Sequence, residues 1–291
     1  MLKNVAQLFA RLFLCLLWAV SAIQAAQTKI CIVMPAYNEE SRIQHTLQTY
    51  AHYFKTKPEN TTFLVVANNC SDDTVKVAKR VQAQTKPQDN ISIEIIDLKP
   101  GGKGFAVKQG FLWALGKDFD LIGFVDADMA TLPQYFYDLV IACNNGDGAI
   151  ASRYIKGANV FPNRPWLRKL GGKLYNWMLR TKLHLPFKDT QCGAKIFNKN
   201  TIQKVAPHMT ETGWAFDLEL LYLCKLEGQV IKEIPTTWSD QPGSHLTISS
   251  KVMKEFLNSP VRIKERHATH KKQLQQHKVC KQSKKFTKKP L

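Results

Sequence analysis

Two pairs of aspartates, each pair separated by one residue, carry the clearest chemical signal in this 291-residue sequence. Asp126 and Asp128 directly follow the apolar run Leu121 to Val125, whereas Asp118 and Asp120 precede it. Ligands of open α/β sheets bind beyond the carboxyl ends of the strands. The second pair therefore predicts carboxylates that hold Mg²⁺ or Mn²⁺ at a diphosphate, with Asp128 as the metal ligand and Asp126 orienting a ribose or sugar. The first pair predicts only a solvated turn.

A glycine-rich turn, Pro100-Gly101-Gly102-Lys103-Gly104, opens a predicted helix. Glycines allow close backbone approach, a helix amino terminus favours an anion, and Lys103 adds a full positive charge. Together these features suit a diphosphate, with Lys103 and Gly104 as contacts. The turn matches neither the Walker A pattern nor the dinucleotide-binding glycine pattern.

Polar and aromatic residues follow the first two predicted strands, at the edge where ligands bind. The candidate contacts to a nucleotide are Pro35, Tyr37, Asn38, Glu39, Asn68 and Asn69. The residues after the first strand form a rigid turn, and its aromatic ring, Tyr37, could hold a base. The side-chain amides of Asn68 and Asn69 could hydrogen-bond the edge of that base. Ser71 or Asp72 is also a candidate amino-terminal cap of the next helix.

Short β-rich runs alternate with stretches of helical periodicity. Strands are predicted at Lys29 to Met34, Thr62 to Ala67, Ile91 to Leu98, Leu121 to Val125, Ala149 to Ser152, Ala194 to Phe197 and Val230 to Ile234; helices are predicted at Glu39 to Phe54, Asp72 to Gln84, Lys103 to Leu115, Pro133 to Cys143 and Phe216 to Leu226. This rhythm predicts an α/β fold with a mostly parallel, doubly wound sheet and flanking helices.

The chain is strongly basic, with 41 Lys and Arg against 23 Asp and Glu and a net charge of +18. Eleven basic residues but only one acidic residue lie between Arg262 and Leu291, which predicts a solvated, disordered tail suited to an anionic membrane face or serving only solubility. No nucleic-acid motif is present, so no nucleic-acid partner is expected. The seven scattered cysteines include no Cys-x-x-Cys pair, so neither a zinc site nor a disulfide framework is predicted.

Several motifs occur in a fixed order: Pro35-Ala36-Tyr37-Asn38-Glu39, Asn68-Asn69-Cys70-Ser71-Asp72-Asp73-Thr74, Gly101-Gly102-Lys103-Gly104, Asp126-Ala127-Asp128 and Ser152-Arg153. This set resembles family 2 glycosyltransferases of GT-A fold. Two later segments, Asp189-Thr190-Gln191-Cys192-Gly193 and Trp214 to Leu221, look like the dolichyl-phosphate β-glucosyltransferase branch, whose relatives include dolichol-phosphate mannose synthases. The resemblance covers Lys29 to Leu246. It departs at Asn68-Asn69-Cys70-Ser71, where the family usually has Asp-Asp-Gly-Ser or Asn-Asp-Gly-Ser, and at His245, where Lys is common after Gly243-Ser244.

The resemblance implies an inverting, metal-dependent hexosyltransferase that moves glucose from UDP-glucose to a polyprenyl or dolichyl phosphate. Arg153 and Arg168 are similar in placement to the arginines that bind the acceptor phosphate, with Arg164 as a third candidate. Asp189, with Asp126 and Asp128, completes the expected catalytic set; it would orient the acceptor, or act as the base for a hydroxyl acceptor.

Three other functions stay open at this stage. The first is a glycosyltransferase with the same donor and a hydroxyl acceptor on a glycan or small molecule. The second is a sugar nucleotidyltransferase, which would carry a glycine-rich loop near the first strand, where Pro35 to Glu40 does not resemble one. The third is a basic membrane-binding module without activity.

Four segments are expected along the chain. Residues 1–27 form a hydrophobic anchor or signal-like segment, 28–153 the nucleotide-sugar half, 154–250 the acceptor half, and 251–291 the basic tail. Nucleotide sugars are cytosolic, so we expect an uncleaved anchor and a membrane-associated catalytic domain that faces the cytosol. Basic and aromatic residues from Asn163 to Lys188 predict an interfacial helix, or else a surface helix with inward-packed Trp residues.

Overall fold

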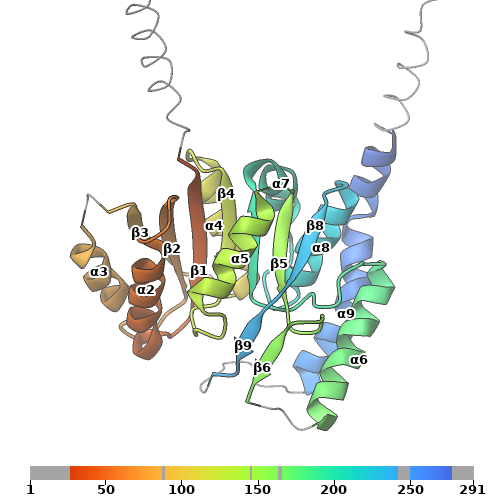
Figure 1. Ribbon diagram of the computed structural model, residues 1–291. Helices are drawn as coiled ribbons and strands as arrows, with labels where there is room; N and C mark the ends of the chain where they lie inside the picture. The colour runs from red at the N-terminus through yellow and green to blue at the C-terminus, as the bar shows by residue number, and fades with distance from the viewer. Residues whose placement is uncertain (1–26, 87–88, 145, 163–165, 242–249, 277–291) are drawn as a thin grey trace, which may run out of the picture.

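The computed structural model describes residues 27–86, 89–144, 146–162, 166–241 and 250–276. A seven-stranded sheet forms its centre, with the strand order β3-β2-β1-β4-β7-β5-β8 (Figure 1). The strands are β1 (Lys29–Ala36), β2 (Asn60–Asn68), β3 (Ile91–Leu98), β4 (Leu121–Val125), β5 (Gly148–Ser152), β7 (Ala194–Asn198) and β8 (Ile231–Pro235). All neighbouring strands pair in parallel except β7, which is antiparallel to β4 and to β5. The predicted mostly parallel α/β sheet is confirmed.

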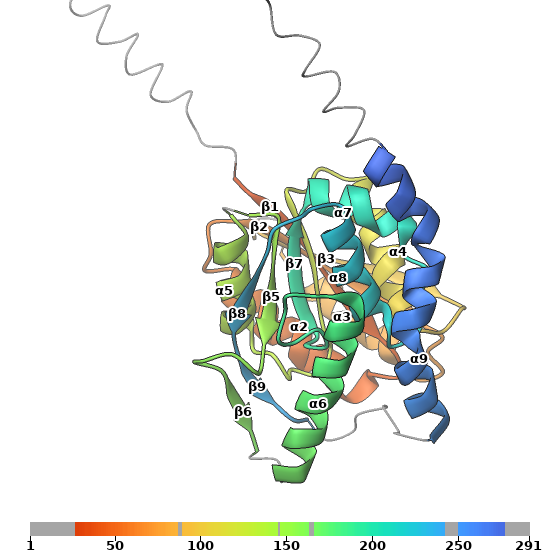
Figure 2. The ribbon, with the colours of Figure 1, turned by 90° about the vertical axis from the view of Figure 1, so that its right-hand side faces the viewer.

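Helices cover both faces of the sheet (Figures 1 and 2). One face carries α2 (Glu40–Phe54), α3 (Thr74–Gln84) and α5 (Pro133–Cys143), and the other carries α4 (Lys103–Leu115), α7 (Lys199–Val205) and α8 (Phe216–Leu226). Along β1, Ile30 and Ile32 belong to the first apolar cluster, whereas Cys31 and Val33 belong to the second. Alternate side chains of a strand point to opposite faces, so a strand covered on both sides must be apolar throughout.

The parallel register brings the chemistry-bearing segments to one edge of the sheet. Ala36 at the end of β1 pairs with Ala67, and the end of β4 lies beside the beginning of β7 through the pair Val125 and Ala194. This carboxyl edge of the parallel strands is the lower edge in Figure 1. The residues before β7 therefore reach the same edge as the residues after β1, β2 and β4.

Two long helices, α6 (Trp166–Leu183) and α9 (Ser250–Arg266), lie side by side against the α8 side of the molecule (Figures 1 and 2). The expectation of a disordered tail from Arg262 onward is wrong for its first part, because α9 runs to Arg266 and the chain is helical again from 268 to 276. Ile263 is fully buried, and Arg262 binds Glu211 of the body. Burial and ion pairs thus order a segment whose composition is typical of a solvated tail.

A second, two-stranded sheet lies at the carboxyl edge of the parallel strands. It pairs β6 (Asn159–Phe161) in parallel with β9 (Thr237–Ser239), and an isolated bridge joins Trp238 of β9 to Thr131 after β4. Neither strand is predicted from the sequence, because three-residue strands have no measurable periodicity.

Within these described residues, no helix combines the length and the apolar character that crossing a membrane requires. The predicted anchor, residues 1–27, lies outside the described residues except for Gln27.

Candidate active site

Asp126 and Asp128 lie at the carboxyl end of β4, as the sequence predicts, and Lys103 reaches them from the first residue of α4. Lys103 Nζ is 2.5 Å from Asp126 Oδ1. Burial opposes the positive charge of Lys103, but Asp126, Asp217 and Asp128 together raise the pKa of its ammonium group. Lys103 is therefore protonated, and the structure brings the predicted diphosphate-binding and metal-binding residues together.

Two side chains of α2 hold the loop that carries Asp128 through hydrogen bonds. Thr46 Oγ1 donates a hydrogen bond to the carbonyl oxygen of Ala127 at 2.7 Å, and Tyr50 Oη donates to that of Thr131 at 2.7 Å. Asp128 Oδ1 accepts from the amide of Ala130 at 2.9 Å. Both donors on α2 are buried, so the loop is fixed by the core rather than by surface contacts.

The two carboxylates have the chemistry of a site for a hard divalent cation. Burial and the neighbouring charge of Asp126 raise the pKa of Asp128, although the Ala130 amide, Lys103 and Arg42 act in the opposite direction. Among the described residues no group of three or more His, Cys, Asp or Glu could hold a metal ion. One or two carboxylates are nevertheless enough for Mg²⁺ when a diphosphate and water supply the other oxygens. The residues present fit such a cation.

The glycine turn before α4 packs tightly against the segment 211–216. Gly102 has φ +124°, a left-handed conformation, and a Cβ atom there would collide with the carbonyl oxygen of Thr212. Lys103 Nζ lies 5.4 Å from the centre of the Trp214 ring and 5.9 Å from that of Phe216. The glycines thus let the backbone come close enough for these rings to flank the ammonium group.

Behind the carboxylates lies a buried ion pair that the sequence analysis did not predict. Lys195 of β7 is fully buried; its Nζ donates to Asp217 Oδ1 of α8 at 2.5 Å and to the Cys192 carbonyl at 2.7 Å. Asp217 interacts electrostatically with both Lys103 and Lys195. The available signal was the lysine itself, a charged residue inside the apolar run Ala194 to Phe197, which requires a buried partner.

The predicted nucleotide contacts lie on adjacent turns after β1 and β2. Tyr37 is 43% exposed, and Asn38 has a left-handed backbone and accepts a hydrogen bond from the Ser71 amide at 2.8 Å. Glu39 is largely buried and accepts two hydrogen bonds from Arg42, at 2.7 and 2.8 Å. The sequence therefore placed these residues on one edge correctly, although Glu39 already has a cationic partner.

Strand β2 ends in the same region. Asn68 is the buried last residue of β2, and Asn69 follows it in a left-handed conformation, with its side chain against Gly101. Pro35 lies within β1. The side chain of Asp72, a predicted cap, accepts from the amide of Thr74, the first residue of α3, at 3.1 Å.

Arg153 and Asp189 form a bidentate pair close to the same edge. Arg153 Nε donates to Asp189 Oδ2 at 2.7 Å and Nη2 donates to Oδ1 at 3.0 Å, while the Arg153 amide donates to Oδ2 at 3.0 Å. Asp189 is fully buried; burial opposes its charge, yet Arg153 and the amide donors hold the pKa of this carboxyl below its usual value. Arg153 also lies 5.4 Å from the ring centre of Trp238.

The remaining predicted residues lie outside the described side chains or at another edge of the sheet. Arg168 lies on α6, but its side chain is outside the described part of the chain, and Arg164 and Gly243 to His245 are outside it altogether. The pair Asp118 and Asp120 lies at the opposite edge of the sheet, where Asp118 binds Lys29 Nζ at 2.6 Å and is strongly exposed. This agrees with the solvated turn that the sequence predicts.

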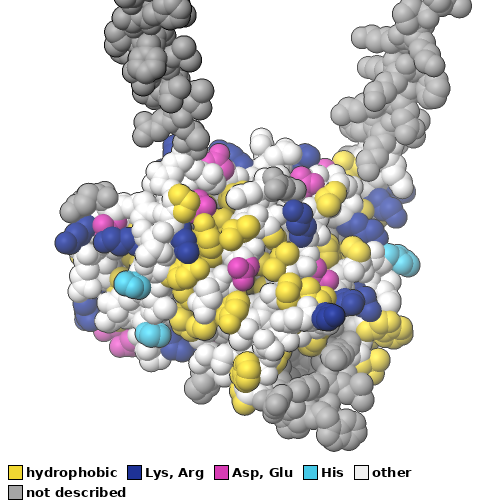
Figure 3. Space-filling model, in the orientation of Figure 1, with side chains coloured by type: hydrophobic (Ala, Val, Ile, Leu, Met, Phe, Trp, Pro, Cys, Tyr) yellow, Lys and Arg dark blue, Asp and Glu magenta, His cyan; other side chains and the backbone are white. Residues whose placement is uncertain are grey.

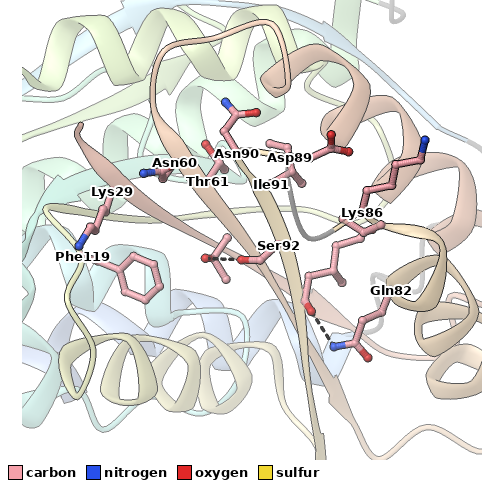
Figure 4. A pocket seen from close by; sticks show the side chains of 13 residues that line it. Lys29, Asn60, Thr61, Gln82, Lys86, Asp89, Asn90, Ile91, Ser92 and Phe119 are labelled. Carbon is pink, nitrogen blue, oxygen red and sulfur yellow. Dashed lines mark hydrogen bonds between the residues drawn. The ribbon is translucent and has the colours of Figure 1, made fainter. Parts of the chain in front are cut away.

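A shallow pocket opens at that opposite edge, among the first residues of β1, β2 and β3 (Figure 4). Thr62 and Ser92 share a hydrogen bond of 2.7 Å there, and Gln82 donates to the carbonyl of Ile93 at 2.6 Å. The pocket contains none of the residues of the carboxylate site. It therefore lies on the wrong edge of the sheet for the predicted chemistry.

The sheet with one reversed strand is an α/β architecture, and the paired carboxylates beside a glycine turn suit a phosphorylated ligand. A model of glycosyl transferase family 2 matches residues 31–212. The chain therefore belongs to this family and is a glycosyltransferase.

Relatives named dolichyl-phosphate beta-glucosyltransferase are similar over three quarters of the chain. The protein of this name from Drosophila melanogaster is 30% identical over 234 residues, covering 75% of this chain and 69% of its own. The one from Dictyostelium discoideum is 29% identical over 229 residues, covering 75% and 68%.

Solved structures share the fold. Glucosyl-3-phosphoglycerate synthase from Mycobacterium tuberculosis, in complex with Mn²⁺, UDP-glucose and phosphoglyceric acid, superposes with a TM-score of 0.55 at 16% identity. The match covers 84% of this chain and 81% of that one. At this identity the likeness concerns the fold alone, which is the GT-A architecture expected from the sequence.

Proposed function

We propose that this glycosyltransferase transfers glucose from UDP-glucose to a polyprenyl phosphate of the dolichyl type, with inversion at the sugar. The observation that carries the proposal is the convergence of Asp126, Asp128 and Lys103 at the carboxyl end of β4. The names of the relatives support the sugar and the acceptor. The UDP-glucose bound by a protein of the same fold supports the donor.

Asp128, with Asp126 beside it, would hold Mg²⁺ or Mn²⁺ in this proposal. The cation would neutralise charge on the departing diphosphate and so make it a better leaving group. Lys103 contributes a second positive charge from the amino terminus of α4, where the helix dipole also favours an anion. Pro35, Tyr37, Asn38, Glu39, Asn68, Asn69 and Gly104 form the proposed surround of the nucleotide.

The transfer needs little acid–base chemistry if the acceptor is a phosphate. Its anionic oxygen attacks C1 of glucose while the bond from C1 to the diphosphate oxygen breaks, and UDP leaves with the electron pair. No proton has to be removed from the nucleophile. The residues that matter are then those that align two anions and screen their repulsion.

Arg153 is the proposed anchor of the acceptor phosphate, with Arg168 as a second. The hydrogen bonds from the Arg153 side chain to Asp189 use Nε and Nη2, so Nη1 is not part of this bidentate pair. A planar guanidinium held on one edge is well suited to bind phosphate with the other. Because the pKa of Asp189 is lowered and both of its oxygens bind Arg153, we assign Asp189 the orientation of Arg153 and not proton abstraction.

A membrane surface is the proposed location of the acceptor. Leu174 and Trp177 on α6 are 60% and 52% exposed, and Arg180 and Lys182 occupy its last turn. Figure 3 displays apolar and basic side chains next to each other over this helix. An exposed helix of this type binds at the interface of anionic lipids, here proposed on the cytosolic side, where nucleotide sugars are made.

The test is transfer of radiolabelled sugar into organic-extractable dolichyl phosphate, with and without Mn²⁺. UDP-glucose, UDP-galactose, UDP-N-acetylglucosamine and GDP-mannose are compared as donors. We expect metal-dependent label from UDP-glucose, lost in Asp128→Ala and retained in Asp118→Ala. The second variant is the matched control, because Asp118 belongs to an identical motif at the opposite edge.

Two results would contradict the proposal in different ways. Release of UDP without labelled lipid would overturn the acceptor and direct the search to hydroxyl acceptors. Full activity of Asp128→Ala in the presence of a chelator would overturn the metal-dependent mechanism.

A further inference from the structure

One buried carboxylate, Glu211, binds two arginines of helix α9. Arg262 Nε and Nη2 donate to Glu211 Oε1 and Oε2, both at 2.7 Å, and Arg266 Nη1 donates to Oε1 at 3.0 Å. Glu211 is only 6% exposed. Two guanidinium groups on a nearly buried carboxylate form a charge-assisted contact that fixes position as well as distance.

A second carboxylate, Glu219 of α8, holds the same segment from the other side. It accepts from the amides of Thr210 and Glu211 at 2.9 and 2.8 Å, and from Nε2 of His267 beyond the end of α9 at 2.7 Å. The backbone at 210–211 is therefore bound to α8 and, through the Glu211 side chain, to α9. It has little freedom to move independently of either helix.

The held segment is the wall against which the glycine turn packs. The Phe105 amide, in the first turn of α4, donates to the Thr212 carbonyl at 3.1 Å. A Cβ atom at Gly104 would collide with the carbonyl oxygen of Glu211 and lie 2.9 Å from that of Gly213. Trp214, two residues after Thr212, contributes the ring beside Lys103. The position of Lys103 is thus coupled to Glu211 through backbone contacts.

We propose that Glu211 is a positioning residue: together with Arg262 and Arg266 of α9 it holds the segment 210–214 so that Lys103 is aligned for the donor diphosphate. The inference rests on the proposed function for the identity of the donor. The match to the family ends at residue 212, and α9 begins at Ser250. A part of the chain that the family match does not reach is therefore assigned to the donor site.

The test compares Glu211→Gln with Glu227→Gln in the full chain, purified in detergent. Glu227 Oε1 binds His270, so its variant also removes an anchor of the same helical region, but it does not contact the glycine turn. We expect Glu211→Gln to raise the KM for UDP-glucose and the Kd for UDP with Mn²⁺ about tenfold, while kcat and the acceptor KM change less than about twofold. Glu227→Gln should leave all four values near those of the wild type.

Hydrogen exchange of the Phe105 amide, measured without substrate, separates this inference from the proposed function. We expect exchange about tenfold faster in Glu211→Gln and unchanged in Glu227→Gln. Arg262→Gln, which removes one of the two arginines, should give an intermediate effect and serves if the first variant does not fold. Unchanged exchange and UDP affinity in Glu211→Gln, or equal losses in both glutamate variants, would overturn the inference. Faster exchange without any binding of UDP would instead overturn the donor assignment.

Discussion

The pair of Arg153 and Asp189 illustrates how one residue can limit the chemistry of another. Both oxygens of Asp189 are occupied by Arg153, and a further hydrogen bond from the Gln191 amide at 3.1 Å reaches Oδ1. A general base needs a free oxygen and a pKa near the working pH, whereas the pKa of Asp189 lies below its usual value. Its geometry is that of a residue that orients an arginine.

Asp189→Asn should therefore mainly weaken acceptor binding. We expect the KM for dolichyl phosphate to rise about tenfold because a neutral amide holds Arg153 less firmly, with kcat reduced less than about threefold. Steady-state kinetics with varied acceptor provide the measurement, and Asn keeps the side-chain size. A fall in kcat of about a thousandfold, rescued at high pH, would instead identify Asp189 as a base.

The sequence alone is sufficient to find the residues whose role depends on where a strand ends. Asp126, Asp128 and Lys103 are predicted correctly as neighbours because each occupies a strand or helix terminus on one edge. Lys195 and Glu211 are missed because their roles depend on partners 22 and 51 residues away. Such pairings come from tertiary packing, which local patterns do not encode.

At the scale of the elements, β7 carries a fully buried charge. Its Lys195 is fully buried beside Asp217 and below the Phe124 ring, at 5.3 Å from the ring centre. Removing one member of a buried pair leaves the other charge without compensation, which usually costs more than the pair contributes.

Lys195→Met should therefore lower the free energy of unfolding by about 3–5 kcal/mol, whereas the double variant Lys195→Met, Asp217→Leu should recover most of that loss. Urea unfolding followed by circular dichroism measures both. The matched control is Lys29→Met, which breaks an exposed Lys–Asp pair and should lower the free energy of unfolding far less, because solvent screens this pair. Equal destabilisation at both lysines would show that Lys195 does not depend on its buried partner.

The contact between α8 and α9 should respond to acid. Burial would raise the pKa of Glu219, but hydrogen bonds from His267, from Thr210 and from the Glu211 amide lower it below its usual value. The stability that Glu219 contributes is then fully present above the unfolded-state pKa of about 4.3 and is lost as the pH falls through the lowered folded-state value.

Glu219→Gln should accordingly flatten the loss of unfolding free energy between about pH 4.5 and pH 3. Urea unfolding across that range, compared with the wild type and with Glu227→Gln, is the measurement. An unchanged slope in Glu219→Gln would mean that its hydrogen bonds contribute nothing to acid sensitivity.

Some helices and strands could be predicted from the sequence and others could not. Helices and strands of the first 150 residues follow their predicted ranges closely, because their apolar periodicity and their neighbours agree. The reversed direction of β7 and the folded state of α9 could not be predicted, since strand direction has no local signature and the charge of α9 resembles that of a solvated tail.

At the scale of the whole molecule, α6 exposes two large apolar side chains and carries basic residues in its last turn. Trp177 and Leu174 lie one turn apart on α6, a helix that extends past the carboxyl edge of the parallel strands (Figures 1 and 2). Contact of this side with lipid would bring a phosphate headgroup close to Arg153 without detaching the acceptor chain from the bilayer.

The double variant Leu174→Ser, Trp177→Ser should weaken binding to vesicles that contain phosphatidylserine about tenfold, because both side chains lose apolar area that lipid would cover. Sedimentation with vesicles measures the partition, and sugar transfer to a water-soluble short-chain acceptor should be unchanged. Ile141→Ser is the matched control, since Ile141 on α5 is 55% exposed on another part of the surface. Equal losses for the α5 and α6 variants would contradict a specific lipid-facing side.

The reversed strand β7 has a consequence for how this enzyme could diversify. Segments that leave β1, β2 and β4 supply the proposed donor contacts, whereas the segment from Asp189 to Gly193 reaches the same edge by entering β7. On the proposed assignment, the donor contacts and the acceptor anchor Arg153 follow strands of one direction, whereas Asp189, which orients Arg153, arrives from the opposite direction. A change of acceptor through this entering segment would have to keep Gly193 in place, because the Asp126 amide donates to its carbonyl oxygen at 3.0 Å and a Cβ atom there would collide with the Asp126 carboxylate.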